Sequence, residues 1–247
     1  MNDTQKYYRD GFIKLNFKKN KSLEEITENL TSIYSGRIKD EFELISKYPG
    51  TKDLRPNVFD YSDAFLRVLF DNKIPQKLFE LTGEKLTLAH VQVRKSENEK
   101  SYMPWHRDMY FIDDRIVGNI PPGHKIIFYP ELPNTKSAGM HLLKGSHLCL
   151  FQKQPADKFV LPGCSYLDQQ LFQLLDTFEY KQSKDEFLIF NTSLLHGALP
   201  DAKEAGSIRL IYSFVRPFQF NKNFGDQDVH LRLNKIYEDM LRNEEKN

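Results

Sequence analysis

Apolar positions in the first third of the chain recur at helical spacing. Residues 22–38, "SLEEITENLTSIYSGRI", place apolar side chains three and four positions apart, at Leu23, Ile26, Leu30 and Ile33. Steps of three and four put these side chains on one face of a helix. The pattern therefore predicts an amphipathic helix, and Ser22, a residue type that favours the first cap position, is its expected N-cap.

Shorter helices are predicted on either side of that segment. Residues 7–15, "YYRDGFIKL", read as a brief helix that turns at Gly11 into a strand. Residues 63–71, "DAFLRVLFD", and residues 74–83, "IPQKLFELTG", read as two more helices, and Gly83 ends the second one. The first third is thus expected to be mainly helical.

From Lys85 onwards the period changes from helical to alternating. In "LTLAHVQVRK" the side chains of Ala89, Val91 and Val93 fall on one side, and those of His90, Gln92 and Arg94 on the other. Further short strands are predicted at residues 124–132, 139–143, 185–190 and 207–215, separated by clusters of Gly, Pro, Asn and Asp. Residues 228–247 predict a closing helix with a charged end.

Helices followed by a run of short strands predict an α+β fold. The arrangement is typical of a β-sandwich or jelly roll supported by helices. No linker, repeat or low-complexity tract divides the 247 residues, so a single domain, residues 1–247, is expected. Within it we expect helical support over residues 1–84, a jelly-roll core over residues 85–220 and a helical tail over residues 221–247.

Composition narrows the classes of function. The net charge is +1, from 35 basic and 34 acidic residues, which provides no overall field for nucleic acid or an anionic membrane. The start has no apolar signal region, and no apolar run approaches the roughly 20 residues needed to span a bilayer, so a cytoplasmic protein is expected. Cys149 and Cys164 form no CxxC pair, which favours free thiols over a disulfide or a thiolate zinc site.

Candidate metal ligands occur in two separate segments. In "PWHRDMYF", residues 104–111, His106 and Asp108 are two apart, so on a strand they share one face. That spacing is common by itself, and a solvated or hydrogen-bonded pair fits it too. A third candidate, His196, follows a later apolar strand. Two imidazoles and one carboxylate form the facial triad that holds Fe(II) and leaves three coordination positions open.

A basic residue accompanies the third candidate ligand. Arg209 lies in the middle of the apolar strand "IRLIYSFV". A guanidinium does not lose its charge in a protein, so a buried one requires an anionic partner. That partner is either a protein carboxylate or a ligand.

The combination of H-x-D, a distal His and a following Arg resembles the Fe(II)/2-oxoglutarate-dependent dioxygenases, and more narrowly the phytanoyl-CoA dioxygenase family. The resemblance spans residues 6–216 and includes "YYRDGFIKL", "PWHRD", "SAGMHLLKGSH" and "FLIFNTSLLHGALPD". It implies a cupin-like double-stranded β-helix in which His106, Asp108 and His196 hold iron. It also implies that Arg209 pairs with the distal carboxylate of 2-oxoglutarate, a contact suited to the planar guanidinium.

One position departs from the family pattern. Members often carry a hydroxyl residue two positions after the distal His to help hold the cosubstrate, and this chain has Ala198 there. Gln92 and Arg94, on the strand before H-x-D, are candidates for that support, and a solvent-facing role is the alternative. The retained Asp108 disfavours halogenation, because the related halogenases lack this carboxylate.

Other polar side chains have weaker claims to a role. Arg107 and Tyr110 are the candidate substrate contacts, and Lys125 is either another contact of an anionic substrate or a solvated charge. His147 is expected to form a hydrogen bond without binding metal. His124, in the turn "PPGHK", is expected to be exposed.

The resemblance implies an oxygenase that uses Fe(II), 2-oxoglutarate and O2 to hydroxylate an unactivated carbon of a small metabolite, with succinate and CO2 as co-products. Two alternatives remain open. One is a metal- or 2-oxoglutarate-binding jelly roll without turnover. The other is a zinc-dependent cupin-like isomerase or hydrolase, which would leave Arg209 unexplained. A sugar, an amino acid or an acyl thioester would each suit the near-neutral charge.

Overall fold

The computed structural model describes residues 1–16, 20–36, 51–55, 58–96, 103–108, 123–130, 140–149, 173–180, 186–198, 208–217, 227–244 and 246. Its helices are α1 (Asp3–Asp10), α2 (Lys21–Tyr34), α3 (Ala64–Asp71), α4 (Ile74–Thr82) and α6 (Gln227–Glu244), with 3-10 turns η1 (Val58–Asp60) and η2 (Ser146–Leu148). Among the described helices, none is long and apolar enough to cross a membrane.

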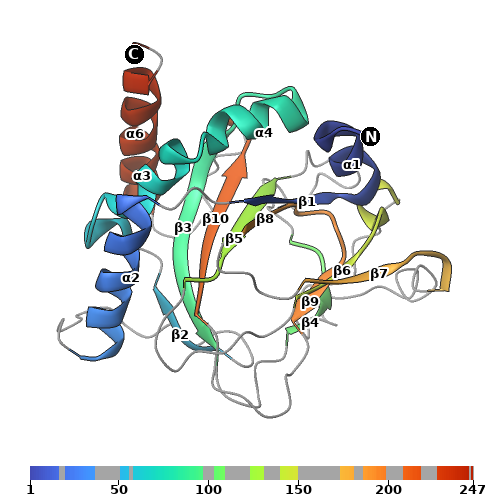
Figure 1. The fold of residues 1–247 in the computed structure, drawn as a ribbon, viewed down its shortest axis with the longest axis horizontal. Coiled ribbons are helices and arrows are strands. Elements are labelled where there is room, and N and C mark those ends of the chain that lie inside the picture. The colour runs from blue at the N-terminus through green and yellow to red at the C-terminus, as the bar shows by residue number, and fades with distance from the viewer. Residues whose placement is uncertain are drawn as a thin grey trace.

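The strands form two antiparallel sheets, shown in Figure 1. The larger sheet has the order β1-β8-β5-β10-β3-β2, formed by β1 (Phe12–Asn16), β8 (Glu186–Asn191), β5 (His124–Phe128), β10 (Ile208–Val215), β3 (Thr87–Ser96) and β2 (Thr51–Arg55). The smaller sheet has the order β4-β9-β6-β7, formed by β4 (Met103–His106), β9 (His196–Ala198), β6 (Met140–Leu143) and β7 (Thr177–Tyr180). From β3 to β10 the chain passes back and forth between the two sheets, except that β6 and β7 follow each other in the smaller one.

Two apolar layers lie on the two faces of the larger sheet. On β10, Leu210 and Tyr212 belong to the layer that packs against the helices, which Figure 1 shows on one side of the sheet. Ile211, between them in sequence, belongs to the second layer, together with Ile127 of β5 and Leu142 of β6. Because side chains alternate along a strand, Arg209 shares the face of Ile211 that is directed towards the smaller sheet.

The predicted helices form, with one difference in how they begin. Gly11 ends α1 in the left-handed conformation, with φ of 82°, and the chain continues into β1 as expected. The N-cap of α2, however, is Asn20, whose side chain accepts a hydrogen bond from the backbone N–H of Leu23. Ser22 was therefore wrong as the cap. It is buried and donates to Asp71 of α3 over 2.6 Å, a partner that local sequence does not reveal.

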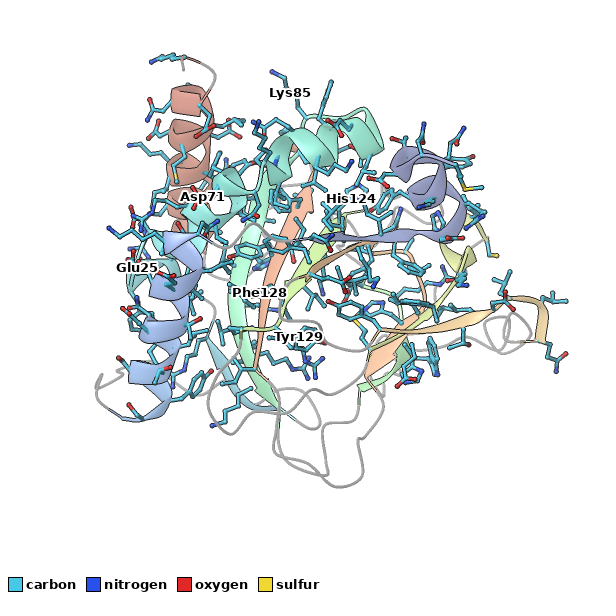
Figure 2. All side chains as sticks on the ribbon, viewed as in Figure 1. Glu25, Asp71, Lys85, His124, Phe128 and Tyr129 are labelled. Carbon is cyan, nitrogen blue, oxygen red and sulfur yellow. The ribbon has the colours of Figure 1, made fainter. Side chains whose placement is uncertain are left out.

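His124 was also placed wrongly by its local sequence. It is the first residue of β5, only 4% exposed, and not part of an exposed turn. Its side chain lies against Tyr7 of α1, with 5.9 Å between ring centroids, and Figure 2 shows His124 between the sheet and this helix. The Tyr7 hydroxyl lies 2.6 Å from His124 Nδ1. Burial lowers the pKa of His124 to about 4.

Three strands were not predicted from the sequence: β2, β7 and β9, whose first residue, His196, was expected in a turn after an apolar strand. Of these, β2 and β7 lie at an edge of their sheet, where a strand has a single neighbour. An edge strand can carry polar residues on both faces, so "TKDLR" and "TFEY" lack a clear alternation. Of the two cysteines, Cys149 is a free thiol, and Cys164 lies outside the described residues.

Candidate metal centre

The backbone register brings the three predicted metal ligands together. His106, the last residue of β4, is paired directly with His196, the first residue of β9. Directly opposite residues of an antiparallel pair lie on the same face of a sheet. The backbone N–H of Asp108 donates to the carbonyl of Thr192 over 2.9 Å, which fixes Asp108 beside the same turn. The side chain of His106 lies outside the described atoms, so its placement rests on the backbone alone.

The side chains of Asp108 and His196 converge on one point. Oδ2 of Asp108 lies 3.2 Å from Nε2 of His196. The other ring nitrogen, Nδ1, lies 2.9 Å from the carbonyl oxygen of Leu194, and since a carbonyl only accepts, Nδ1 carries a proton. Phe190 packs against the imidazole, with 4.8 Å between ring centroids. The ring orientation is thus fixed with Nε2 directed at the carboxylate.

This arrangement suits a metal ion. In a neutral imidazole protonated at Nδ1, Nε2 presents a lone pair, as the carboxylate oxygen does. Two electron-pair donors 3.2 Å apart repel each other unless a proton or a metal ion lies between them. A ligating histidine usually donates its other N–H to a carbonyl, as His196 does to Leu194. Among the described side chains, which do not include that of His106, no group of three metal-binding residues occurs.

Lys125 joins the larger sheet to this point. Its Nζ lies 2.6 Å from Oδ2 of Asp108, and both side chains are mostly buried. Lys125 is on β5, directly opposite Phe190 of β8, so it is on the face directed towards the smaller sheet. The sequence left Lys125 between a substrate contact and a solvated charge, and the structure places its ammonium against the candidate metal ligand.

Arg107 lies between two candidate ligands in sequence but points elsewhere. It is 3% exposed, and its guanidinium donates to the carbonyls of Ser146, over 2.9 Å, and Ser193. These bonds tie the turn before β9 to η2. The position favours a structural role for Arg107 over the predicted substrate contact. Tyr110, the other predicted substrate contact, lies outside the described residues.

The predicted cosubstrate residues share the interior face of β3 and β10. Arg94 on β3 is paired directly with Arg209 on β10, and Gln92 is paired with Ile211. Ile211 belongs to the apolar layer between the two sheets, so this face is not directed to solvent. Arg94 and Arg209 are 8% and 6% exposed. Like charges directly opposite each other repel, and a carboxylate placed between the two guanidinium groups would offset that repulsion.

Tyr129 is a neighbour of this pair that the sequence analysis did not single out. It directly follows β5 and is fully buried in the layer between the sheets. The sequence did contain a signal for its position, because Lys125, Ile127 and Tyr129 occupy alternate positions and so share one face of the strand. Without knowledge of the opposite strand, nothing connected the tyrosine with Arg209. The side chain of Ala198, the departure from the family pattern, lies outside the described atoms.

Comparisons with known proteins identify the fold. No protein-family model matches the sequence, and no curated protein is significantly similar to it. Solved structures do match. The epimerase SnoN, in complex with Fe3+, alpha ketoglutarate and nogalamycin RO, superposes with a TM-score of 0.64 and 14% identity, covering 92% of this chain and 87% of SnoN.

Two further structures agree with this match. The non-heme alpha ketoglutarate-dependent carbocyclase SnoK, from nogalamycin biosynthesis, has a TM-score of 0.62 at 9% identity, covering 90% of this chain and 87% of SnoK. HygX from Streptomyces hygroscopicus, with nickel, 2-oxoglutarate and hygromycin B bound, has a TM-score of 0.57 at 16% identity, covering 86% of this chain and 85% of HygX. At these identities the comparisons show the fold alone, which this chain shares with SnoN, SnoK and HygX.

Proposed function

We propose that this protein is an Fe(II)- and 2-oxoglutarate-dependent oxygenase that acts on a small molecule. The observation that carries the proposal is the contact between Asp108 and His196. A carboxylate oxygen and an imidazole nitrogen lie 3.2 Å apart, with the imidazole held by a backbone carbonyl. The backbone of His106 lies opposite His196, which makes it the third ligand of the proposed facial triad.

The polar residues on the interior face of β3 and β10 fit 2-oxoglutarate. The cosubstrate carries a carboxylate at each end, so it requires cationic partners in a buried site. Arg209, with Arg94 directly opposite, supplies two guanidinium groups on one interior face, and Gln92 adds an amide on the same face. In the proposal Arg209 binds the distal carboxylate, with Arg94 and Gln92 as further contacts. Iron, 2-oxoglutarate and O2 would together supply the oxidising power for attack on an unactivated C–H bond.

The protein's own contribution is orientation and exclusion of water. Leu194 O fixes the tautomer and direction of His196, and Phe190 packs against the same ring. The apolar layer between the sheets, with Ile127 and Ile211 among its members, keeps the surroundings of the arginine pair poor in water. A dry site strengthens the contacts to charged groups and limits side reactions of a strong oxidant.

We also infer that the two sheets are the halves of a jelly roll. The successive strands from β3 to β10 divide between the sheets, and all described pairs are antiparallel. A division of successive strands between two facing antiparallel sheets is what a double-stranded β-helix requires. A single domain over residues 1–247 is part of the same proposal.

Hydroxylation is the proposed outcome, with succinate and CO2 as co-products. SnoN is described as an epimerase and SnoK as a carbocyclase, so the fold supports other outcomes too. Structures with nogalamycin RO in SnoN and hygromycin B in HygX support a small-molecule substrate. The mass of the product separates these outcomes, because hydroxylation adds one oxygen atom and epimerisation leaves the mass unchanged.

The test combines binding with turnover. Anaerobic protein is titrated with Fe(II) and then with 2-oxoglutarate, following the metal-to-ligand absorption band. Under air, succinate released from 2-oxoglutarate is measured with Fe(II) and, separately, with Zn(II). Asp108→Ala and His196→Ala should each abolish the band and the succinate while leaving the fold intact, since a metal ligand contributes little to a β core.

His147→Ala is the matched control, because His147 binds the Tyr8 carbonyl and not the candidate centre. This variant should retain both the absorption band and the release of succinate. Binding of iron and 2-oxoglutarate without succinate would favour the non-catalytic alternative. If Asp108→Ala binds iron as tightly as the wild-type protein does, the proposed metal centre is wrong.

A further inference from the structure

Tyr129 is a fully buried phenol in the layer between the two sheets. Its exposed fraction is 0%, and its ring centroid lies 6.1 Å from that of Tyr180 on β7. It directly follows β5, and Met140 and Leu142 of the smaller sheet belong to the same layer. Figure 2 shows Tyr129 between the larger sheet and the strands of the smaller one.

The hydroxyl of Tyr129 has no hydrogen-bond partner among the described residues. Leaving a buried hydroxyl unpaired is costly, and buried phenols normally find a partner. Tyr212, which is equally buried but faces the helices, donates to the carbonyl of Phe65 over 2.7 Å. A phenol without such a partner at an interior face is therefore a candidate for ligand binding.

The register places this phenol beside Arg209. Phe128 is paired with Leu210, so Tyr129 and Arg209 occupy the next positions along the two antiparallel strands. The positive charge of Arg209 acts on the phenol and lowers its pKa, although burial outweighs this and raises the pKa overall. The phenol therefore keeps its proton next to a guanidinium, and both groups are hydrogen-bond donors.

We propose that the Tyr129 hydroxyl donates a hydrogen bond to the distal carboxylate of 2-oxoglutarate, on the same side as Arg209. The inference rests on the proposed function and adds a residue to its cosubstrate site. Two neighbouring donors, one cationic and one neutral, match a carboxylate, which accepts several hydrogen bonds. Tyr129 thereby takes the part of the hydroxyl residue that is missing at Ala198.

The variant Tyr129→Phe removes one oxygen and keeps the buried ring. In the anaerobic Fe(II) protein, its affinity for 2-oxoglutarate should fall about 10-fold or more, as expected for loss of a hydrogen bond to a charged group. Iron binding should not change. The melting temperature should stay the same or rise, since an unpaired buried hydroxyl has been removed.

A second 2-oxo acid identifies the end of the cosubstrate that Tyr129 contacts. 2-Oxopentanoate has the same carbon chain with a methyl group in place of the distal carboxylate. Wild-type protein and Tyr129→Phe should bind it with equal affinity, because the acceptor is absent. If Tyr129→Phe lost affinity equally for both 2-oxo acids, Tyr129 would contact another part of the cosubstrate, and the inference would be wrong.

Tyr212→Phe is the matched control, another buried phenol on the opposite face of the larger sheet. It should lower the melting temperature, because the Phe65 carbonyl loses its donor, and leave both 2-oxo acid affinities unchanged. If wild-type protein binds 2-oxoglutarate and Tyr129→Phe binds it equally well, the inference fails and the proposed function stands. If wild-type protein with bound iron does not bind 2-oxoglutarate, both fail.

Discussion

The buried imidazole of His124 should make the protein lose stability in mild acid. His124 is 4% exposed, and its Nδ1 lies 2.6 Å from the Tyr7 hydroxyl, which donates to the neutral ring in the tautomer with its proton on Nε2. Burial is the main cause that lowers its pKa to about 4, from 6.5 for an unperturbed histidine. The nearby Glu84 acts in the opposite direction, and Arg216 and His147 act in the same direction as burial. The folded state therefore favours the neutral ring.

The size and the direction of the effect follow from the two pKa values. Above pH 6.5 the ring is neutral in both states, so it has no effect on the pH dependence of stability. As the pH falls below 6.5, the unfolded chain binds a proton that the folded protein does not, and the free energy of unfolding decreases. This loss of unfolding free energy grows until about pH 4, where it reaches about 3 kcal/mol. The magnitude follows because each tenfold difference in proton affinity between the two states corresponds to about 1.4 kcal/mol.

Urea unfolding at several pH values between about 7.5 and about 4.5 measures this loss. The comparison variant is His124→Gln, which keeps a hydrogen-bond acceptor for Tyr7 and does not titrate in this range. Carboxylates whose pKa values are lowered by ion pairing, such as Glu84 beside Arg216, also titrate as the pH falls, but they do so in both proteins. The difference between the two curves therefore isolates His124. Parallel loss of stability in wild type and variant would refute this explanation.

Three further predictions concern the site and the fold. Arg209→Lys keeps the charge but loses the planar fork, so 2-oxoglutarate affinity in the anaerobic titration should fall about 10- to 100-fold with iron retained. Unchanged affinity with a lower melting temperature would limit Arg209 to stabilising its strand. Lys125→Met removes the ammonium 2.6 Å from Asp108 Oδ2, so calorimetry should show about tenfold tighter Mn(II) binding, and weaker binding would mean that the lysine positions Asp108 for the metal. Gly11→Ala should lower the free energy of unfolding by about 1–3 kcal/mol more than Gly83→Ala, because both have positive φ but only at Gly11 would a Cβ meet another side chain, 2.6 Å away. Equal losses in urea unfolding would contradict that steric argument.

Local patterns in the sequence determined most elements and the candidate ligands. The alternation in β3 places His90, Gln92 and Arg94 on one face, and the register confirms that they share it. The position of Arg209 in an apolar strand predicted a buried guanidinium, and it is 6% exposed. These features depend on the side-chain period of a strand, which is encoded within a few consecutive residues. The assignment of His106, Asp108 and His196 to iron stays a prediction.

Only the tertiary structure decided which residues lie opposite each other. His124 is buried because α1 covers the start of β5, and Asn20 caps α2 while Ser22 turns to α3. Arg94 faces Arg209, and Tyr129 lies next to that pair, through strand pairing between segments distant in sequence. A strand's own sequence specifies which side chains share a face, because that depends on backbone geometry. The neighbouring strand and its register depend on how distant segments pack, and no local pattern contains that information.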